Sequence, residues 1–235
     1  MFHASDFFSI DDEIIPAVGH FGIVWDILSE LPELIEALSS GKRRIQGLVM
    51  DGSFLDDGLI YIEAGARIEP GVYIKGPAYI GRDVVVRHGA YIRESVILMD
   101  SCVLGHASEA KNSLLLSGAS APHFAYIGDS ILGNRVNLGA GVKLSNKKIT
   151  VDGSGLGGTV KIRSDGGDVD TRLTKLGAIL GDDVKIGCNT VLNPGTLIGP
   201  RTLVYPGLSI RSGRYPADMI LKQNNRMCGR TYSAG

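Results

Sequence analysis

Aliphatic side chains recur every six residues through most of this chain. The positions are Ile62, Ile68, Ile74, Ile80, Val86, Ile92, Leu98 and Leu104, then Leu132, Leu138 and Leu144, then Leu180, Ile186, Leu192, Ile198, Val204 and Ile210. Side chains alternate faces along a strand and return every 3.6 residues on a helix, so neither element keeps every sixth residue inside. The period indicates a parallel β-helix, in which three six-residue units make one coil.

This six-residue repeat of aliphatic residues, which we call the six-residue beat, predicts an all-β solenoid and sets its boundaries. The repeats resemble those of the left-handed β-helix, an exception to the right-handed rule for parallel crossovers. Its narrow aliphatic interior suits an aromatic content of only 6%. We expect the β-helix over 46–212, an N-terminal helical cap over 1–45, and a tail over 213–235 that leaves the β-helix and contains a short helix over 217–223.

The N-terminal region has the apolar spacing of helices. Within 18–40 this spacing predicts two short helices that meet near Glu30. Terminal repeats must hide their edge strands, so we expect these helices to cover the open end of the first coil. A helix pair that binds a partner around Trp25 is the alternative.

The beat is interrupted twice. Ile127 lies only five residues before Leu132, so one coil should be irregular there. Residues 147–177 are rich in glycine and charge and form a predicted inserted loop, with strand-like pieces at 148–151 and 159–162. These pieces favour an extruded hairpin, and long excursions from a solenoid often build its binding face.

Composition narrows the function classes. The 235 residues carry a net charge of −1, which gives no nucleic-acid footprint. Three widely spaced cysteines argue against a disulfide framework or a CxxC zinc site. The first residues lack the order of a signal peptide, and no run reaches the ~18 apolar residues of a membrane span. We expect a soluble, cytoplasmic protein without a membrane partner.

Basic residues and histidines recur at the spacing of one coil. Arg93 and Lys111 are eighteen residues apart, as are His88 and His106, and His123 follows seventeen residues later. A basic ledge beside an imidazole suits an anionic substrate that must lose a proton. Spacing alone leaves open that Arg93 and Lys111 are part of a solvated outer face.

Two segments are more specific. Residues 121–129 read Ala-Pro-His-Phe-Ala-Tyr-Ile-Gly-Asp, and residues 137–141 read Asn-Leu-Gly-Ala-Gly. They resemble the catalytic segment and the acetyl-CoA- and sugar-binding turn in the acetyltransferase domain of the bifunctional N-acetylglucosamine-1-phosphate uridyltransferases. Residues 60–215 resemble the family in their hexapeptide repeats, and residues 93–146 resemble it in the residues of the site.

The resemblance implies acetyl transfer from acetyl-CoA to the amine of an amino-sugar phosphate, either glucosamine-1-phosphate or galactosamine-1-phosphate. It implies His123 as general base, an oxyanion-stabilising N–H near Ala140, and no metal. It also implies a homotrimer with sites at the subunit seams. The implied substrate-binding residues are Arg93, Glu109, Lys111, Tyr126, Asn137 and Asn146, and the implied cofactor-binding residues are Ala140, Cys188, Pro206 and Lys222.

The chain departs from the family pattern at several places. Cys188 stands where the family tends to have Ser, and Pro206 replaces a small residue. Lys222 stands near the position where the family has a basic residue for the CoA phosphates. Nothing in 1–60 resembles the Gly-rich loop of the family's nucleotidyltransferase domain. We therefore expect acetyl transfer only, with uridylyl transfer left to a separate nucleotidyltransferase.

Two other functions share the predicted fold. One is a non-catalytic trimeric scaffold or regulatory subunit of a sugar-nucleotide pathway, since fold alone does not decide function. The other is a γ-type carbonic anhydrase, which binds zinc through three histidines. For that function His88, His106 and His123 are the available ligands, but the short His-x4-His spacing of that family is missing.

Overall fold

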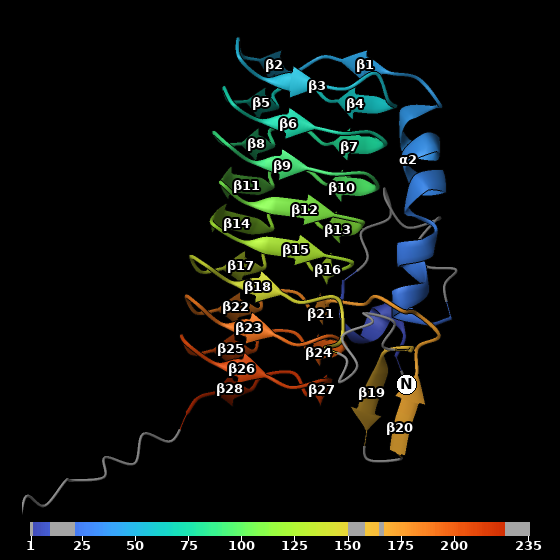
Figure 1. Ribbon diagram of the computed structural model, residues 1–235, viewed down its shortest axis with the longest axis vertical. Helices are drawn as coiled ribbons and strands as arrows, with labels where there is room; N and C mark the ends of the chain where they lie inside the picture. Colours follow the sequence, from blue (N-terminus) through green and yellow to red (C-terminus); the bar gives the residue numbers. More distant parts are fainter. Residues whose placement is uncertain (1, 10–21, 150–157, 165–166, 224–235) are drawn as a thin grey trace, which may run out of the picture.

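A computed structural model describes residues 2–9, 22–149, 158–164 and 167–223 (Figure 1). The chain winds into a prism of three parallel sheets, named sheets A, B and C, and each complete coil adds one strand to each sheet.

The strands of sheet A are β1 (Arg44–Ile45), β4 (Ile60–Ile62), β7 (Ala78–Ile80), β10 (Val96–Leu98), β13 (Ser113–Leu115), β16 (Ile131–Leu132), β21 (Ala178–Leu180), β24 (Thr196–Ile198) and β27 (Gly213–Tyr215). Those of sheet B are β2 (Leu48–Val49), β5 (Arg67–Ile68), β8 (Val85–Val86), β11 (Val103–His106), β14 (Ser120–His123), β17 (Asn137–Leu138), β22 (Lys185–Ile186), β25 (Leu203–Val204) and β28 (Ile220–Leu221). Those of sheet C are β3 (Phe54–Leu55), β6 (Tyr73–Ile74), β9 (Tyr91–Ile92), β12 (Glu109–Lys111), β15 (Tyr126–Gly128), β18 (Lys143–Leu144), β23 (Val191–Leu192) and β26 (Ser209–Ile210).

The six-residue beat fills the interior of the prism. Every aliphatic position of the beat is buried, and the most exposed of them, Ile210 near the C-terminal end, is only 8% exposed. Each coil therefore places one such residue from each sheet against its neighbours above and below. The predicted hexapeptide solenoid is confirmed, and it is consistent with a left-handed β-helix.

The coils change length at the predicted irregularity. Val96 pairs with Ala78, eighteen residues earlier, but with Ser113, seventeen residues later. The missing residue is at the corner between sheets C and A, where Asn112 and Asp129 each make a one-residue turn with φ of 43° and 46°. Asn and Asp tolerate this left-handed backbone better than most residues.

The N-terminal helices lie on the flank of the prism. They are the 3₁₀ helices Ala4–Asp6 and Val24–Ser29 and the α-helix α2 (Leu31–Ser39), and the last two meet at Glu30 as predicted. The prediction that they cover the open end is wrong, because α2 runs along sheet A beside β7 and β10 (Figure 1). The reason is that sheet A turns apolar side chains outward, including Tyr79, Ile97 and Leu114, which form a second core with Trp25.

The inserted segment contains a hairpin. Its antiparallel strands are β19 (Lys161–Ser164) and β20 (Gly167–Asp170). The strand predicted over 159–162 is shifted by two residues, and the piece predicted over 148–151 reaches beyond the described residues. Val160 and Ile162 are buried in the second core, so the hairpin is packed against the body of the solenoid.

The tail prediction is wrong over the residues that the structure describes. Instead of leaving the β-helix after 212 and forming a helix over 217–223, the chain adds β27 and β28, which pair with β24 and β25. Leu221 follows Val204 by seventeen residues, the spacing of the tight coils, so its side chain packs against the aliphatic interior of the prism. Residues 224–235 lie outside the described part. Among the described helices, none is long and apolar enough to cross a bilayer.

Replacing Gly105 with Ala tests the inter-coil contact. A Cβ at Gly105 would lie 1.7 Å from the Pro122 backbone oxygen on the next coil, whereas a Cβ at Gly22 would meet nothing within 4 Å. Because the backbone must shift to relieve this clash, we expect Gly105→Ala to cost about 3 kcal/mol of unfolding free energy. Thermal melting followed by circular dichroism measures this, with Gly22→Ala as the control. Equal melting temperatures for the two variants would contradict the close approach.

Candidate functional site

Six residues stack at the corner between sheets B and C. We call them the corner column: His88, His106, His123, Ala140, Cys188 and Pro206. Each turn is bonded to the preceding coil, as in the hydrogen bonds from Phe124 N to His106 O (2.9 Å) and from Gly141 N to His123 O (3.0 Å). The register therefore aligns the predicted catalytic histidine with three of the four predicted cofactor-binding residues.

The three histidines of the corner column differ in their hydrogen bonds. The rings of His88 and His106 are stacked 5.6 Å apart, and their Nδ1 atoms lie 2.6 Å and 2.8 Å from the carbonyl oxygens of Pro70 and His88. A carbonyl only accepts, so both Nδ1 atoms carry protons. His123 is exposed, and its imidazole makes no hydrogen bond to any described residue. It is available to a ligand.

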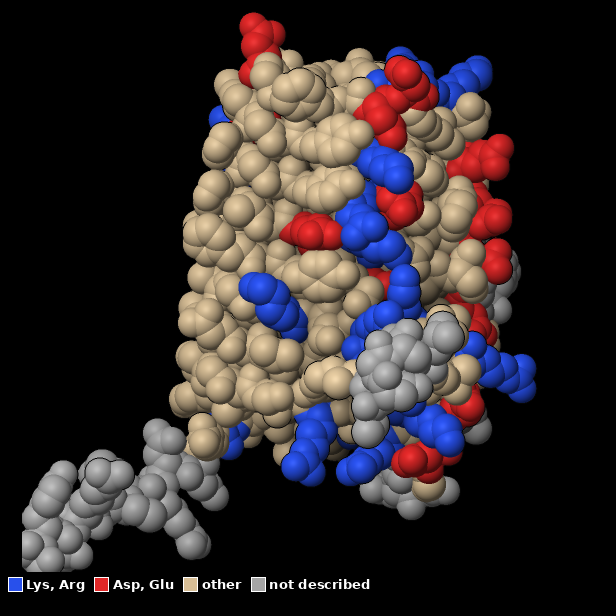
Figure 2. All heavy atoms as spheres, in the orientation of Figure 1, with Lys and Arg blue, Asp and Glu red and all other residues tan. Residues whose placement is uncertain are grey.

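A second group lies on sheet C and the corner that follows it. We call it the polar cluster: Arg93, Glu109, Lys111, Tyr126, Asp129 and Asn146. Arg93 Nη1 is 3.1 Å from Glu109 Oε1, and Lys111 Nζ is 3.8 Å from Asp129 Oδ1. Figure 2 shows acidic and basic side chains interleaved down this face.

Asp129 is the centre of the polar cluster and is missing from the residues predicted from sequence. Its side chain is only 7% exposed. It accepts hydrogen bonds from Asn112 Nδ2 (2.9 Å) and Asn146 Nδ2. The three residues are spaced by seventeen, the length of the tight coils, and this spacing is the signal that would have found Asp129. The Asp129 carboxylate contacts both Lys111 and Asn146 and so fixes their positions relative to each other.

The polar cluster is balanced in charge. Arg93 and Lys111 were predicted as a basic ledge, but each pairs with a carboxylate. Both cations retain further N–H donors for a ligand, because a guanidinium has five and an ammonium three. Burial raises the pKa of the Tyr126 phenol, and the charges of Glu109 and Asp129 raise it further. The phenol therefore keeps its proton at neutral pH.

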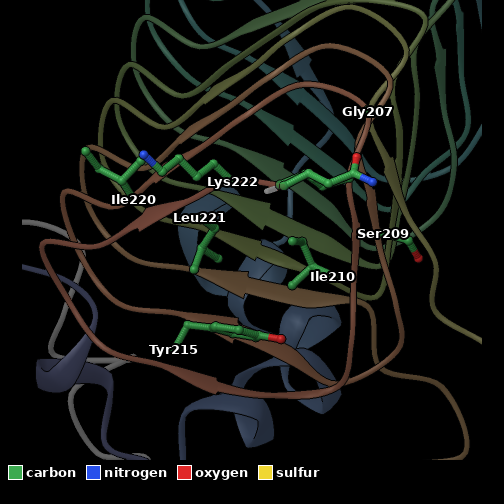
Figure 3. A pocket seen from close by; sticks show the side chains of 9 residues that line it. Gly207, Ser209, Ile210, Tyr215, Ile220, Leu221 and Lys222 are labelled. Atoms are coloured by element: carbon green, nitrogen blue, oxygen red, sulfur yellow. The ribbon is translucent and has the colours of Figure 1, made fainter. Parts of the chain in front are cut away.

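Two predicted residues lie apart from both groups. Asn137 is on sheet B, paired in register with Ser120 and Lys185, so a corner separates it from the polar cluster. Lys222 follows the last strand of sheet B and lines a hollow of about 620 Å³ at the open end of the prism. Figure 3 shows the apolar side chains of Ile210, Tyr215 and Leu221 at this hollow. Lys222 is the only predicted cofactor-binding residue outside the corner column.

The arrangement of side chains does not support the alternative of a γ-type carbonic anhydrase, which needs a zinc site. Over the described part of the chain, no three His, Cys, Asp or Glu side chains are grouped so that they could hold a metal ion. The three histidines instead lie one above the other on successive coils.

Comparison with known proteins places the chain in a family. A family model described as bacterial transferase hexapeptide (six repeats) matches residues 60–94. A bifunctional sugar-1-phosphate nucleotidylyltransferase/acetyltransferase of Sulfurisphaera tokodaii is 35% identical over 150 residues, which cover 64% of this chain and 36% of that protein. The solved structure of a UDP-N-acetylglucosamine acyltransferase from Campylobacter jejuni has a TM-score of 0.47 and 15% identity, covering 68% of this chain and 66% of that one.

The extent of the matches differs between relatives. The chain spans only 31 to 42% of the length of four bifunctional relatives, the Sulfurisphaera protein among them. An uncharacterized acetyltransferase, YaiX, of Escherichia coli O6:K15:H31 is 32% identical over 210 residues, which cover 85% of this chain and 88% of that protein. Because this match extends over most of both proteins, the chain belongs to the hexapeptide-repeat acetyltransferases.

Proposed function

We propose that this acetyltransferase moves the acetyl group of acetyl-CoA to the amine of an amino-sugar phosphate, glucosamine-1-phosphate or galactosamine-1-phosphate. The observation that carries the proposal is the exposed imidazole of His123, whose nitrogens make no hydrogen bond to a described residue, on a corner that adjoins the polar cluster. The sugar-1-phosphate in the name of the Sulfurisphaera relative supports this acceptor class.

The chemistry requires a base, an oxyanion donor and a phosphate site. His123 takes the proton as the amine nitrogen bonds to the thioester carbonyl carbon, and returns it to the thiolate as the C–S bond breaks. A backbone N–H near Ala140 stabilises the oxyanion, a contribution of about 3 kcal/mol in comparable sites. Arg93 and Lys111 bind the phosphate, and Tyr126 and Asn146 donate to the sugar.

The corner column fits the thioester arm of acetyl-CoA. Below His123 it presents Ala140, Cys188 and Pro206, side chains that are small or compact, in a straight line along the prism. Cys188 and Pro206 are exposed, so an extended ligand can contact them. Lys222 lies one coil farther, where a phosphate-bearing end would pass.

We further propose that the working unit is a homotrimer with its sites at the seams. Within one prism Asn137 faces outward from sheet B, while the polar cluster is on sheet C and the corner after it. A second subunit that packs its sheet B against this sheet C would bring its own Asn137 to the cluster. The site is incomplete without that neighbour.

Replacing His123 tests the proposed base. We expect His123→Ala to lower the rate of CoA release with a sugar 1-phosphate by about 100-fold or more, the usual contribution of a general base. The melting temperature should not change, because the side chain is exposed. His88→Ala, on the same column but two coils away, is the control. A wild-type rate in His123→Ala would show that this residue is not the base.

Asp129→Asn tests the buried carboxylate as a positioning residue. Without its charge Lys111 and Asn146 lose their shared anchor, so we expect the KM for the sugar phosphate to rise by about tenfold with a smaller change in kcat. Asp218→Asn, which breaks an exposed ion pair with Arg201, should leave both parameters unchanged. Loss of kcat with KM unaltered would contradict a positioning role.

Mixing His123→Ala with Asn137→Ala, each expected to be inactive alone because the proposed site needs both side chains, tests the seam. In a trimer assembled at random from His123→Ala and Asn137→Ala subunits, about a quarter of the seams combine an intact His123 with an intact neighbouring Asn137. We therefore expect co-expressed subunits to recover about that fraction of wild-type activity. A mixture no more active than the separate variants would place both residues in one subunit's site.

A further inference from the structure

A polar pocket lies between the inserted hairpin and the last coils of sheet C. Its volume is about 500 Å³, and the residues that line it are Arg163, Asn193, Ser209, Arg211 and Ser212. None of these residues belongs to the corner column or the polar cluster. We call it the hairpin pocket.

The walls of the hairpin pocket are held in place by hydrogen bonds. Ser212 Oγ donates to the Lys161 carbonyl oxygen at 2.7 Å, which ties β19 to the last coil. Asn193 Nδ2 donates to Ser209 Oγ at 3.0 Å and to the Ile210 carbonyl oxygen at 2.7 Å. The hairpin is further anchored by its buried apolar side chains. The pocket is therefore built before a ligand arrives.

The charge of the hairpin pocket is unbalanced. Arg163 and Arg211 are both exposed, and neither forms an ion pair with a described carboxylate. Asp168 is opposite Arg163 in the hairpin register but does not pair with it. Arg201 and Arg214, on the same coils, by contrast pair with Asp218 and Asp6. Figure 2 shows Lys and Arg side chains gathered at this end of the face.

We propose that the hairpin pocket binds a diphosphate group. A guanidinium is a planar fork that holds the oxygens of one phosphoryl group, so two arginines match two phosphoryl groups. The hydroxyl of Ser209, which accepts from Asn193 Nδ2, keeps its own proton to donate to a phosphoryl oxygen at the same place. Arg211 follows β26, four strands along sheet C from Lys111, which is about 19 Å. The pocket is thus distinct from the phosphate-binding residues of the proposed function.

Isothermal titration calorimetry at low ionic strength tests the hairpin pocket without requiring turnover. The probes are inorganic pyrophosphate, UDP and free CoA, which carry the diphosphate alone, on a nucleoside, or within the longer coenzyme. The proteins are the full chain, Arg163→Gln, Arg211→Gln and the control Arg82→Gln. Arg82 is an exposed arginine close to the N-terminal end of the prism.

We expect at least one probe to bind the wild-type chain. Each pocket substitution should lower the affinity for that probe by about tenfold, as for loss of a charged hydrogen bond. Arg82→Gln should change nothing. A loss common to all probes identifies the bare diphosphate as the ligand, and a loss confined to UDP or to CoA identifies its carrier. Absence of binding by the wild-type chain overturns the proposal. So does retention by both pocket variants of the wild-type affinity for every probe that binds, or an equal loss of affinity in Arg82→Gln.

Discussion

The register between successive coils is the constraint on which the rest of this structure depends. Parallel pairing places a residue directly above its counterpart on the preceding coil, which is seventeen or eighteen positions earlier in most coils and forty-eight earlier across the inserted segment. In the interior this alignment stacks aliphatic side chains into one continuous core that no single coil could bury. On the surface the same alignment turns residues far apart in sequence into straight columns. The corner column and the polar cluster are both products of it.

A one-residue change in coil length shapes the candidate site. Where the corner between sheets C and A loses a residue, Asn112 and Asp129 take left-handed turns and come into register with each other. The buried serines Ser113 and Ser130 support these turns by bonding to the carbonyl oxygens of Lys111 and Gly128. The tight corner thus has both structural and chemical consequences, because it places a buried carboxylate beside a lysine.

The sequence was most informative where one residue type repeats in register. The aliphatic beat predicts the coils, and the eighteen-residue spacing of Arg93 and Lys111 predicts their adjacency, because both depend only on strand pairing. The position of the N-terminal helices was mispredicted, since the apolar outer side of sheet A is visible only once the prism is built. The helix predicted over 217–223 does not form, because pairing of this segment with β25 overrides its local helix propensity.

Side-chain partnerships were the least predictable part of the site. Sequence spacing indicates that two cations are neighbours, but it does not show that Glu109 and Asp129 neutralise them. Nor does it show that His123 differs from His88 and His106, since that depends on which carbonyl oxygen each ring reaches. The inserted hairpin likewise contributes Arg163 to a pocket with Arg211 only through three-dimensional packing.

Acetyl transfer to an amino-sugar phosphate is the reaction that we propose for this site. A thiol-release assay tests it most directly, with acetyl-CoA as donor and glucosamine-1-phosphate, galactosamine-1-phosphate and UDP-linked amino sugars as acceptors. We expect CoA release that depends on a sugar 1-phosphate bearing a free amine and that does not occur when this amine is already acetylated. Absence of acceptor-dependent release across the panel, from a folded protein, would contradict it.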